Sequence, residues 1–399
     1  EIDFSGATVS LANFREGPAL PSDAVFYLVA TDGADDIAAL PENQSAYARQ
    51  GLTRGYNFIV DDMADGQTPD KQYLVARLVY TGPAPEARII NEGRIAGLAF
   101  VSNSAGWLAD HSYESADLNI REKEGGWEYA SFGGADAGWQ RIETGAHLDL
   151  TSSHLMLGRT AKRVREDGSL LYGGFIDAGF GHYGVRGDFG GAGQVSGRGN
   201  LRTVGLGFMT RRVRADGLRL EASLRGGQLR NRFRSYELTD TDGNITRYDL
   251  RVPYFGGHLG IGKEKKLSGK DRLDILLRYY YARQNGKTIT LHTDERVDFA
   301  ADESHRLRLG TRFTRQKNEY RYWYVGAALE YEFDGKARGI ADGQYRLGEP
   351  DMGGLTGVLE VGGVAKPKPD SRFSAEYGVQ FYAGKRSGLS GGIRLAWRF

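Results

Sequence analysis

The last twelve residues, Gly388–Phe399, alternate so regularly in polarity that they constrain the fold more than any other segment. One side of an extended chain would carry Leu389, Gly391, Ile393, Leu395, Trp397 and Phe399. The other side would carry Ser390, Gly392, Arg394, Ala396 and Arg398. Because successive side chains of a strand point to opposite faces, this segment predicts a β-strand with one apolar face and one small or basic face. Aromatic residues at the end of such a strand are typical of a membrane interface.

Segments with a similar alternation recur along the chain from Trp127 onward. We expect twelve strands, at Glu128–Gly138, His147–Lys162, Leu170–His182, Asn200–Arg212, Leu218–Arg232, Val252–Lys265, Asp271–Gln284, Glu303–Arg315, Tyr322–Asp334, Leu355–Lys366, Arg372–Ala383 and Gly388–Phe399. Alternation alone does not distinguish a soluble barrel from a membrane barrel, because the membrane barrel places its charges in a wet lumen and its apolar face outside.

The connections between these segments alternate between short and long. The short ones are residues 163–169, 213–217, 266–270, 316–321 and 367–371, and the long ones include 183–199, 233–251, 285–302 and 335–354. Short periplasmic turns and longer outer loops are typical of outer-membrane barrels. We therefore predict an all-β chain in which residues 127–399 form a twelve-stranded antiparallel outer-membrane β-barrel. Its last strand would end on the periplasmic side.

The composition agrees with this class of protein. The chain has 57 Gly, 22 Tyr and 18 Phe, and its formal net charge of +1 provides no case for nucleic-acid binding. No window approaches 18 apolar residues, so a transmembrane helix is not expected. The absence of cysteine excludes a disulfide framework and a thiolate metal site.

Residues 1–82 differ from the rest, because six of the ten prolines lie before residue 86. Extended segments are expected at Ala7–Phe14, Ala24–Ala30, Tyr56–Val60 and Tyr73–Tyr80. We interpret this region as a small β unit or as the last rungs of a β-solenoid, which would require a polar cap.

Residues 83–126 form the expected linker, with a helix from Glu86 to about Ala109. It would include Ile89, Glu92, Arg94, Leu98 and Asn103. These charges make the segment too polar to face lipid. Each interior glycine costs a helix about 1 kcal/mol, which indicates that the helix must be narrow at these positions. An amphipathic helix packed on a soluble domain is the alternative.

The combination of a charged helix, a twelve-strand count and a terminal Phe resembles the translocator domain of autotransporters, the type V secretion system. The similarity includes the helical linker from Ile89, a first strand at Gly126–Tyr129, a Gly-rich turn and a strand ending at His154–Gly158. The resemblance implies that the helix lies inside the pore and joins the barrel to a passenger exported to the surface of the bacterial cell, with residues 1–82 as the end of that passenger.

The same resemblance implies the partners and several site residues. Outer-membrane lipid, the barrel assembly machinery and the chain's own passenger would be the partners of a monomer, and the machinery would read Leu395, Trp397 and Phe399 in the final strand. The lumen would have a basic wall formed by Arg219, Arg225, Arg272, Arg278, Arg306, Arg308, Arg312 and Arg394. This wall would pair with Glu92 or carry solvent. Some relatives cut themselves between adjacent asparagines, but Asn91 and Asn103 stand apart here, so such cleavage is not expected.

No motif indicates an enzyme, a cofactor or a metal. Gly179–Gly184 fits a dinucleotide fingerprint by its letters but opens no helix, and the tripeptide Arg186–Asp188 lies in an expected outer loop. The seven histidines lack metal-ligand spacing, although His182 and His258 near strand ends could serve a surface protease. Two alternatives stay open: a porin-like channel with an open pore, and a surface adhesin or enzyme that acts through its outer loops.

Overall fold

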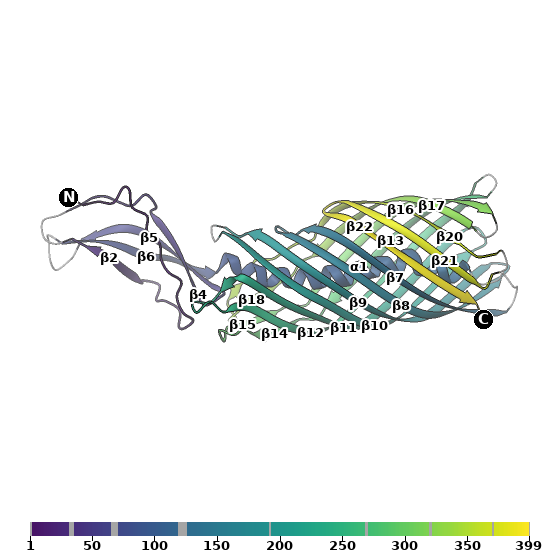
Figure 1. Cartoon of the computed structure of the whole chain (residues 1–399), viewed down its shortest axis with the longest axis horizontal. Helices are drawn as coiled ribbons and strands as arrows, with labels where there is room; N and C mark the ends of the chain where they lie inside the picture. Colours follow the sequence, from purple (N-terminus) through teal and green to yellow (C-terminus); the bar gives the residue numbers. More distant parts are fainter. Residues whose placement is uncertain are drawn as a thin grey trace.

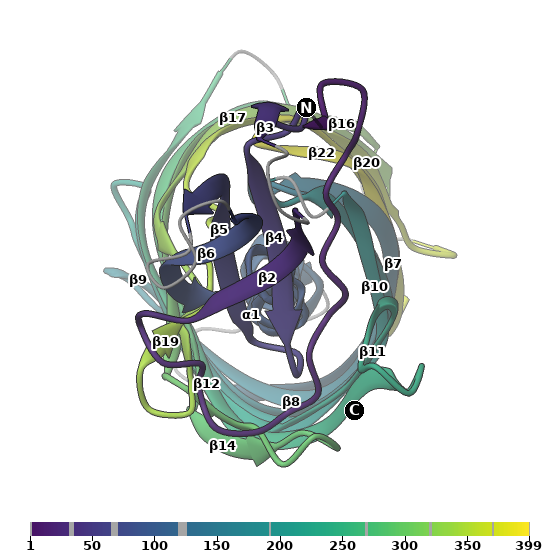
Figure 2. The ribbon, with the colours of Figure 1, turned by 90° about the vertical axis from the view of Figure 1, so that its left-hand side faces the viewer.

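The computed structural model describes residues 2–31, 36–64, 71–118, 126–190, 193–267, 270–318, 321–368 and 371–398. A small N-terminal β unit stands at one end of a long barrel, and the C-terminus lies at the other end (Figure 1). One helix runs along the inside of the barrel, and the end view shows it surrounded by strands (Figure 2).

The N-terminal unit is built on a four-stranded antiparallel sheet. Its order is β2 (Val25–Ala30), β6 (Gln72–Pro83), β5 (Arg54–Ala64) and β4 (Ser45–Gln50). Two short strands, β1 (Ile2–Asp3) and β3 (Ile37–Ala39), pair in parallel. The expected strand at Ala7–Phe14 is reduced to an isolated parallel bridge between Phe14 and Gln50, so that segment is extended without a full ladder. The solenoid-end interpretation stays a prediction.

The helix begins later and ends later than the sequence predicted. A 3-10 turn, η1 (Pro85–Ala87), leads into α1 (Arg88–Leu118). Pro85 is well suited to a first turn, because a backbone N–H at that position would have no hydrogen-bond partner within the helix. Helix α1 therefore continues past Ala109, the end that the sequence predicted. No helical segment in the described ranges is both long and apolar enough to cross a membrane.

Twelve strands of the described chain close into an antiparallel barrel, which confirms the predicted fold class. They are β7 (Trp127–Glu143), β8 (His147–Arg165), β9 (Gly168–Asp188), β10 (Gln194–Arg214), β11 (Leu218–Thr239), β12 (Ile245–Lys266), β13 (Asp271–Gln284), β16 (Asp302–Asn318), β17 (Arg321–Gly335), β20 (Gly354–Ala365), β21 (Phe373–Gly384) and β22 (Arg386–Arg398). Closure is by β22 on β7, from Arg386 opposite Ile142 to Arg398 opposite Ala130.

The outward face of the barrel is apolar over a broad belt. Leu206 and Ile393 point outward with 69% and 59% of their surface exposed. On the same strand as Ile393, Arg394 and Ala396 point inward and are buried. This is the pattern of a membrane barrel, whose apolar face meets lipid.

Beyond this belt the strands continue where the sequence analysis expected long loops, which corrects the loops at 183–199 and 233–251. There β9 reaches Asp188 and β11 reaches Thr239. The alternation inverts in this outer part: Tyr183, Phe233 and Leu250 point inward and are buried. These strand ends were not predicted because the strands were traced by apolar residues on the outward face.

The other two expected loops contain short hairpins. These are β14 (Lys287–Thr290) with β15 (Arg296–Phe299), and β18 (Gly339–Ala341) with β19 (Tyr345–Arg346). They join into one four-stranded sheet at the outer mouth of the barrel.

Candidate functional site: the helix-filled lumen and its outer mouth

The outer half of α1 packs in an apolar collar made by the inverted strand ends. Ile89 and Leu98, two of the residues expected on a pore helix, are fully buried in the same apolar cluster as Phe233 and Leu250. Burial of each large aliphatic side chain contributes about 1.5–3 kcal/mol. The collar therefore holds the helix by ordinary core packing.

Two helix glycines allow the collar to approach closely. A Cβ on Gly93 would lie 2.2 Å from the hydroxyl of Tyr248, and a Cβ on Gly97 would lie 2.8 Å from the Gln284 Oε1. These are contacts that a larger side chain cannot make. Both positions therefore require a residue without a side chain, as expected from the glycines in the sequence.

Polar anchors fix the helix against the rim. Arg94 Nη2 donates to Asp302 Oδ2 at 2.8 Å, and neither side chain is exposed. Glu92 accepts a hydrogen bond from Thr144 Oγ1 at 2.7 Å and pairs with Arg88 at 3.2 Å. Glu92 therefore bonds to an outer turn and to its own helix rather than to the arginines of the lumen.

Both asparagines of the helix are hydrogen-bonded to the barrel. Asn91 donates to the carbonyl of Gly348 at 3.0 Å. Asn103 donates to Gln140 Oε1 at 2.7 Å and accepts from Arg386 Nη1 at 2.7 Å. These bonds hold the two side chains toward the wall.

All eight arginines expected on the lumen wall lie inside the barrel. Arg225 and Arg306 reach the helix, where they donate to the main-chain carbonyls of Val101 and Ser102. The other six contact carboxylates: Arg219–Asp274 2.8 Å, Arg272–Glu264 3.7 Å, Arg278–Glu221 2.5 Å, Arg308–Glu330 3.4 Å, Arg312–Glu360 2.6 Å and Arg394–Glu376 3.1 Å. The expected basic wall is therefore incorrect, because inward carboxylates alternate with the arginines.

The sequence itself carries a signal for these inward carboxylates. Glu330 and Glu376 stand on the charged side of their predicted strands, just as Arg308 does. The same period-two rule that places an arginine inward places these carboxylates inward.

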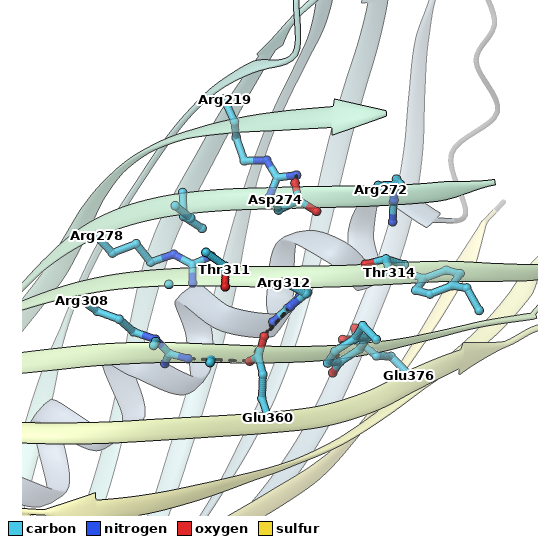
Figure 3. A pocket seen from close by; sticks show the side chains of 16 residues that line it. Arg219, Arg272, Asp274, Arg278, Arg308, Thr311, Arg312, Thr314, Glu360 and Glu376 are labelled. Carbon is cyan, nitrogen blue, oxygen red and sulfur yellow. Dashed lines mark hydrogen bonds and ion pairs between the residues drawn. The ribbon is translucent and has the colours of Figure 1, made fainter. Parts of the chain in front are cut away.

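Among the described residues that line the lumen, the cavities found are small. A cavity of about 40 Å³ is lined by Arg219, Arg308 and Arg312 together with Asp274 and Glu360. Figure 3 shows how these side chains point into the lumen. Two cavities beside the helix measure about 30 Å³ each. Each has room for only a few water molecules.

A turn of the N-terminal unit, which was not singled out from the sequence, docks on a hairpin at the outer mouth. Glu295, between β14 and β15, accepts hydrogen bonds from the main-chain amides of Leu52 at 2.8 Å and Thr53 at 2.9 Å. It also accepts one from Thr53 Oγ1 at 2.6 Å. Gly51 has a φ of +57°, and a Cβ there would lie 2.9 Å from the carboxylate, so only glycine suits this position.

Leu52 and its neighbours continue this contact into the collar. Leu52 is fully buried in the same cluster as Leu291 and Phe299 of the outer hairpins. Arg49 donates to the carbonyl of Thr239 and pairs with Glu86 at 3.1 Å. We call residues Gly51–Thr53 the docking turn.

The motifs set aside in the sequence analysis lie on the strands of the barrel. Gly179–Gly184 is regular strand within β9, and Arg186–Asp188 forms its outer end. His182 is exposed, and His258 Nδ1 lies 2.6 Å from Ser223 Oγ inside the lumen. No group of metal-binding side chains occurs among the described residues.

The final strand closes the barrel and presents its apolar side chains outward. Leu395 and Trp397 are exposed on the outer face of β22, next to β7. Phe399 lies outside the described residues.

These features define an outer-membrane β-barrel whose lumen holds a helix of its own chain. A sequence model of the Autotransporter beta-domain family matches residues 130–378, so the chain belongs to that family. This confirms the resemblance found in the sequence.

Two solved structures share the fold. The β domain of the Bordetella autotransporter BrkA is 18% identical, with a TM-score of 0.53 over 68% of this chain and 100% of that chain. The translocator domain of the autotransporter NalP from Neisseria meningitidis is 12% identical, with a TM-score of 0.53 over 75% of this chain and 99% of that chain. No curated protein sequence matches the chain.

Proposed function

We propose that this chain anchors in the outer membrane and exports an N-terminal passenger to the cell surface. In this proposal residues 1–82 are the end of the passenger, 83–126 the linker and 127–399 the translocator. The path of α1 is the observation that carries the proposal. The helix leaves the N-terminal unit at the end with the extended strands and runs toward the end with the C-terminus (Figure 1). A chain drawn outward through the barrel would be left in this arrangement.

The filled lumen supports this function over a porin-like channel. A solute channel requires a continuous opening, whereas the interior cavities beside the helix and wall measure about 30–40 Å³. Buried polar bonds such as Arg94–Asp302 also hold the helix in place. The outer loops could still carry an adhesin or enzyme activity, and loop deletion would remove such an activity while display of the N-terminus persisted.

An epitope tag placed just before Glu1 tests the proposal on intact cells. We expect antibody and added protease to reach this tag. The matched control is the same tag in the short turn at Glu166–Asp167, at the opposite end of the barrel, which should stay protected. An N-terminal tag that is reached only after the outer membrane is opened would overturn the proposal.

We also propose that the barrel assembly machinery reads Leu395, Trp397 and Phe399. Two of these side chains are exposed on the strand that completes the barrel. Deleting Phe399 together with Trp397→Ser should reduce the amount of folded barrel in the membrane, measured by its heat-dependent shift on gels. Ser387→Ala, at the other end of β22, should leave that amount unchanged. Equal yields from all variants would refute the assignment.

A further inference from the structure

Eight arginines gather on the outward face of the barrel just beyond the apolar belt. This outer arginine patch comprises Arg186 on β9, Arg198 and Arg202 on β10, Arg230, Arg232 and Arg234 on β11, and Arg247 and Arg251 on β12. Their side chains alternate with the inward residues of the collar, so they point away from the barrel. They are distinct from the arginines of the lumen.

The patch lies at the outer edge of the surface that would face lipid. On β10 the same face carries Val204 (62% exposed) and Leu206 directly below Arg202, and Arg212 marks the other edge beside Asp167. Ten residues of a strand tilted by about 40° rise roughly 25 Å, the height of an outer-membrane apolar band. Arg202 is therefore level with the headgroups of the outer leaflet.

The strand register places like charges directly opposite one another. Arg198 faces Arg234, and Arg230 faces Arg202 on one side and Arg251 on the other. Like charges in directly opposed positions destabilise a sheet. An anion bound from outside the protein would neutralise these charges and remove the repulsion between the opposed arginines.

The protein supplies little of that neutralisation. Asp249 accepts hydrogen bonds from Arg230 at 2.9 Å and from Arg232 at 3.2 Å. Within the described ranges, Arg186, Arg202, Arg247 and Arg251 take part in no ion pair. The patch therefore retains a clear positive excess.

Other parts of the outer rim do not share this charge. On β7 and β8, Arg141 pairs with Asp149 at 2.8 Å. On β16 and β17 the corresponding surface carries Glu303, His305 and exposed Phe333. These two surfaces therefore lack the positive excess of β9–β12.

We propose that the outer arginine patch binds the phosphate groups of a phosphorylated glycolipid in the outer leaflet. Guanidinium groups bind phosphate through paired, charge-assisted hydrogen bonds. The apolar surface immediately below, including Val204 and Phe255, meets the acyl chains of the same lipid. The bound lipid relieves the repulsion between opposed arginines and sets the depth of this side of the barrel.

The test uses the full chain, purified in detergent, and its thermal unfolding midpoint. Phosphorylated lipid A should raise the midpoint of the parent protein, and dephosphorylated lipid A should raise it much less. In the variant R202Q/R247Q/R251Q the rise should be lost, and the apparent affinity for phosphorylated lipid A should fall by about tenfold or more, since each substitution removes charged hydrogen bonds. Without lipid this variant should unfold at or above the parent's midpoint, because repulsion is relieved.

The matched control removes the same charge at the periplasmic rim, as R165Q/R214Q/K265Q, and should respond to lipid like the parent. Equal responses of the parent to both lipids, or an unchanged response in R202Q/R247Q/R251Q, would overturn the proposal. Soluble heparin that stabilises the parent as strongly as phosphorylated lipid A would also overturn it, in favour of a soluble polyanion.

Discussion

Arg94 of the helix and Asp302 of the barrel form an ion pair at 2.8 Å in which neither side chain is exposed. The pair does not stand alone. Gln284 donates to the same carboxylate oxygen at 2.9 Å, and Arg94 also reaches the carbonyls of Asn285 and Ala300. One arginine therefore ties α1 to the ends of β13 and β16.

We predict that Asp302→Asn lowers the free energy of unfolding by about 3–5 kcal/mol, because it leaves the Arg94 charge buried without its counter-charge. The double variant R94M/D302L should lose less, since no charge is then stranded. Urea unfolding in detergent measures both. Asp149→Asn, which breaks the exposed pair with Arg141, is the control and should change the free energy of unfolding little. Similar losses at both sites would contradict this account.

The docking turn depends on the charge of Glu295. In Glu295→Gln an amide group replaces one acceptor oxygen, so either the donors of Leu52 and Thr293 or the two donors of Thr53 face another donor. We expect docking to weaken by about 1.5–3 kcal/mol. Trypsin should then cleave at Arg49 or Arg54 at least tenfold faster. Asp242→Asn removes an exposed contact with Arg15 between the same two parts of the chain, and should change cleavage little. If E295Q resists trypsin as the parent does, the carboxylate is not what holds the turn.

Replacing a helix glycine with alanine should change the stability of the protein in opposite directions at Gly93 and at Gly106. Alanine gains about 1 kcal/mol of helix propensity over glycine. At Gly93 the added methyl group meets the hydroxyl of Tyr248 at 2.2 Å, and such overpacking typically costs 1–3 kcal/mol. Gly93→Ala should therefore destabilise the protein. At Gly106 the nearest atom is the flexible end of Arg306 at 3.2 Å, so Gly106→Ala should be neutral or stabilising. The unfolding midpoints compare them, and an increase at Gly93 would refute the close packing.

The outer turn between β11 and β12 should loosen in acid. Hydrogen bonds from Asn244, together with nearby His292, hold the pKa of Asp240 below its ordinary value of 3.8. A carboxyl whose pKa is depressed by folding stabilises the fold above the unfolded pKa, and this stability is lost as the pH falls through the folded pKa. Amide hydrogen exchange at Asp242 and Asn244, corrected for intrinsic rates, should lose protection below about pH 3.8. In Asp240→Asn the protection should no longer change over this pH range, because an amide oxygen still accepts these bonds but does not titrate; a variant with the parent's profile would exclude Asp240 as the cause.

The sequence predicted the strands and their two faces wherever apolar, lipid-facing residues alternate with polar, inward-facing ones. Leu307 and Leu309 against Arg306 and Arg308 placed a strand and both of its faces correctly. The prediction failed beyond the membrane, where Leu201 and Phe233 point inward and charged residues point outward. In that part of the barrel apolar residues face inward rather than outward, so the rule used for the lipid-facing part does not hold. The docking turn could not be found either, since Glu295 and Thr53 are far apart in sequence and only the assembled hairpins bring them together.

The helix in the lumen also determines how many exported segments each barrel can serve. A barrel whose interior is occupied by a segment of its own chain has no room for a second one, and α1 is covalently joined to both the N-terminal unit and β7. If this barrel exports its own N-terminus, each copy delivers one cargo and is then spent. The density of passenger on a cell would follow the rate at which new copies are synthesised and inserted, and no turnover number would describe it.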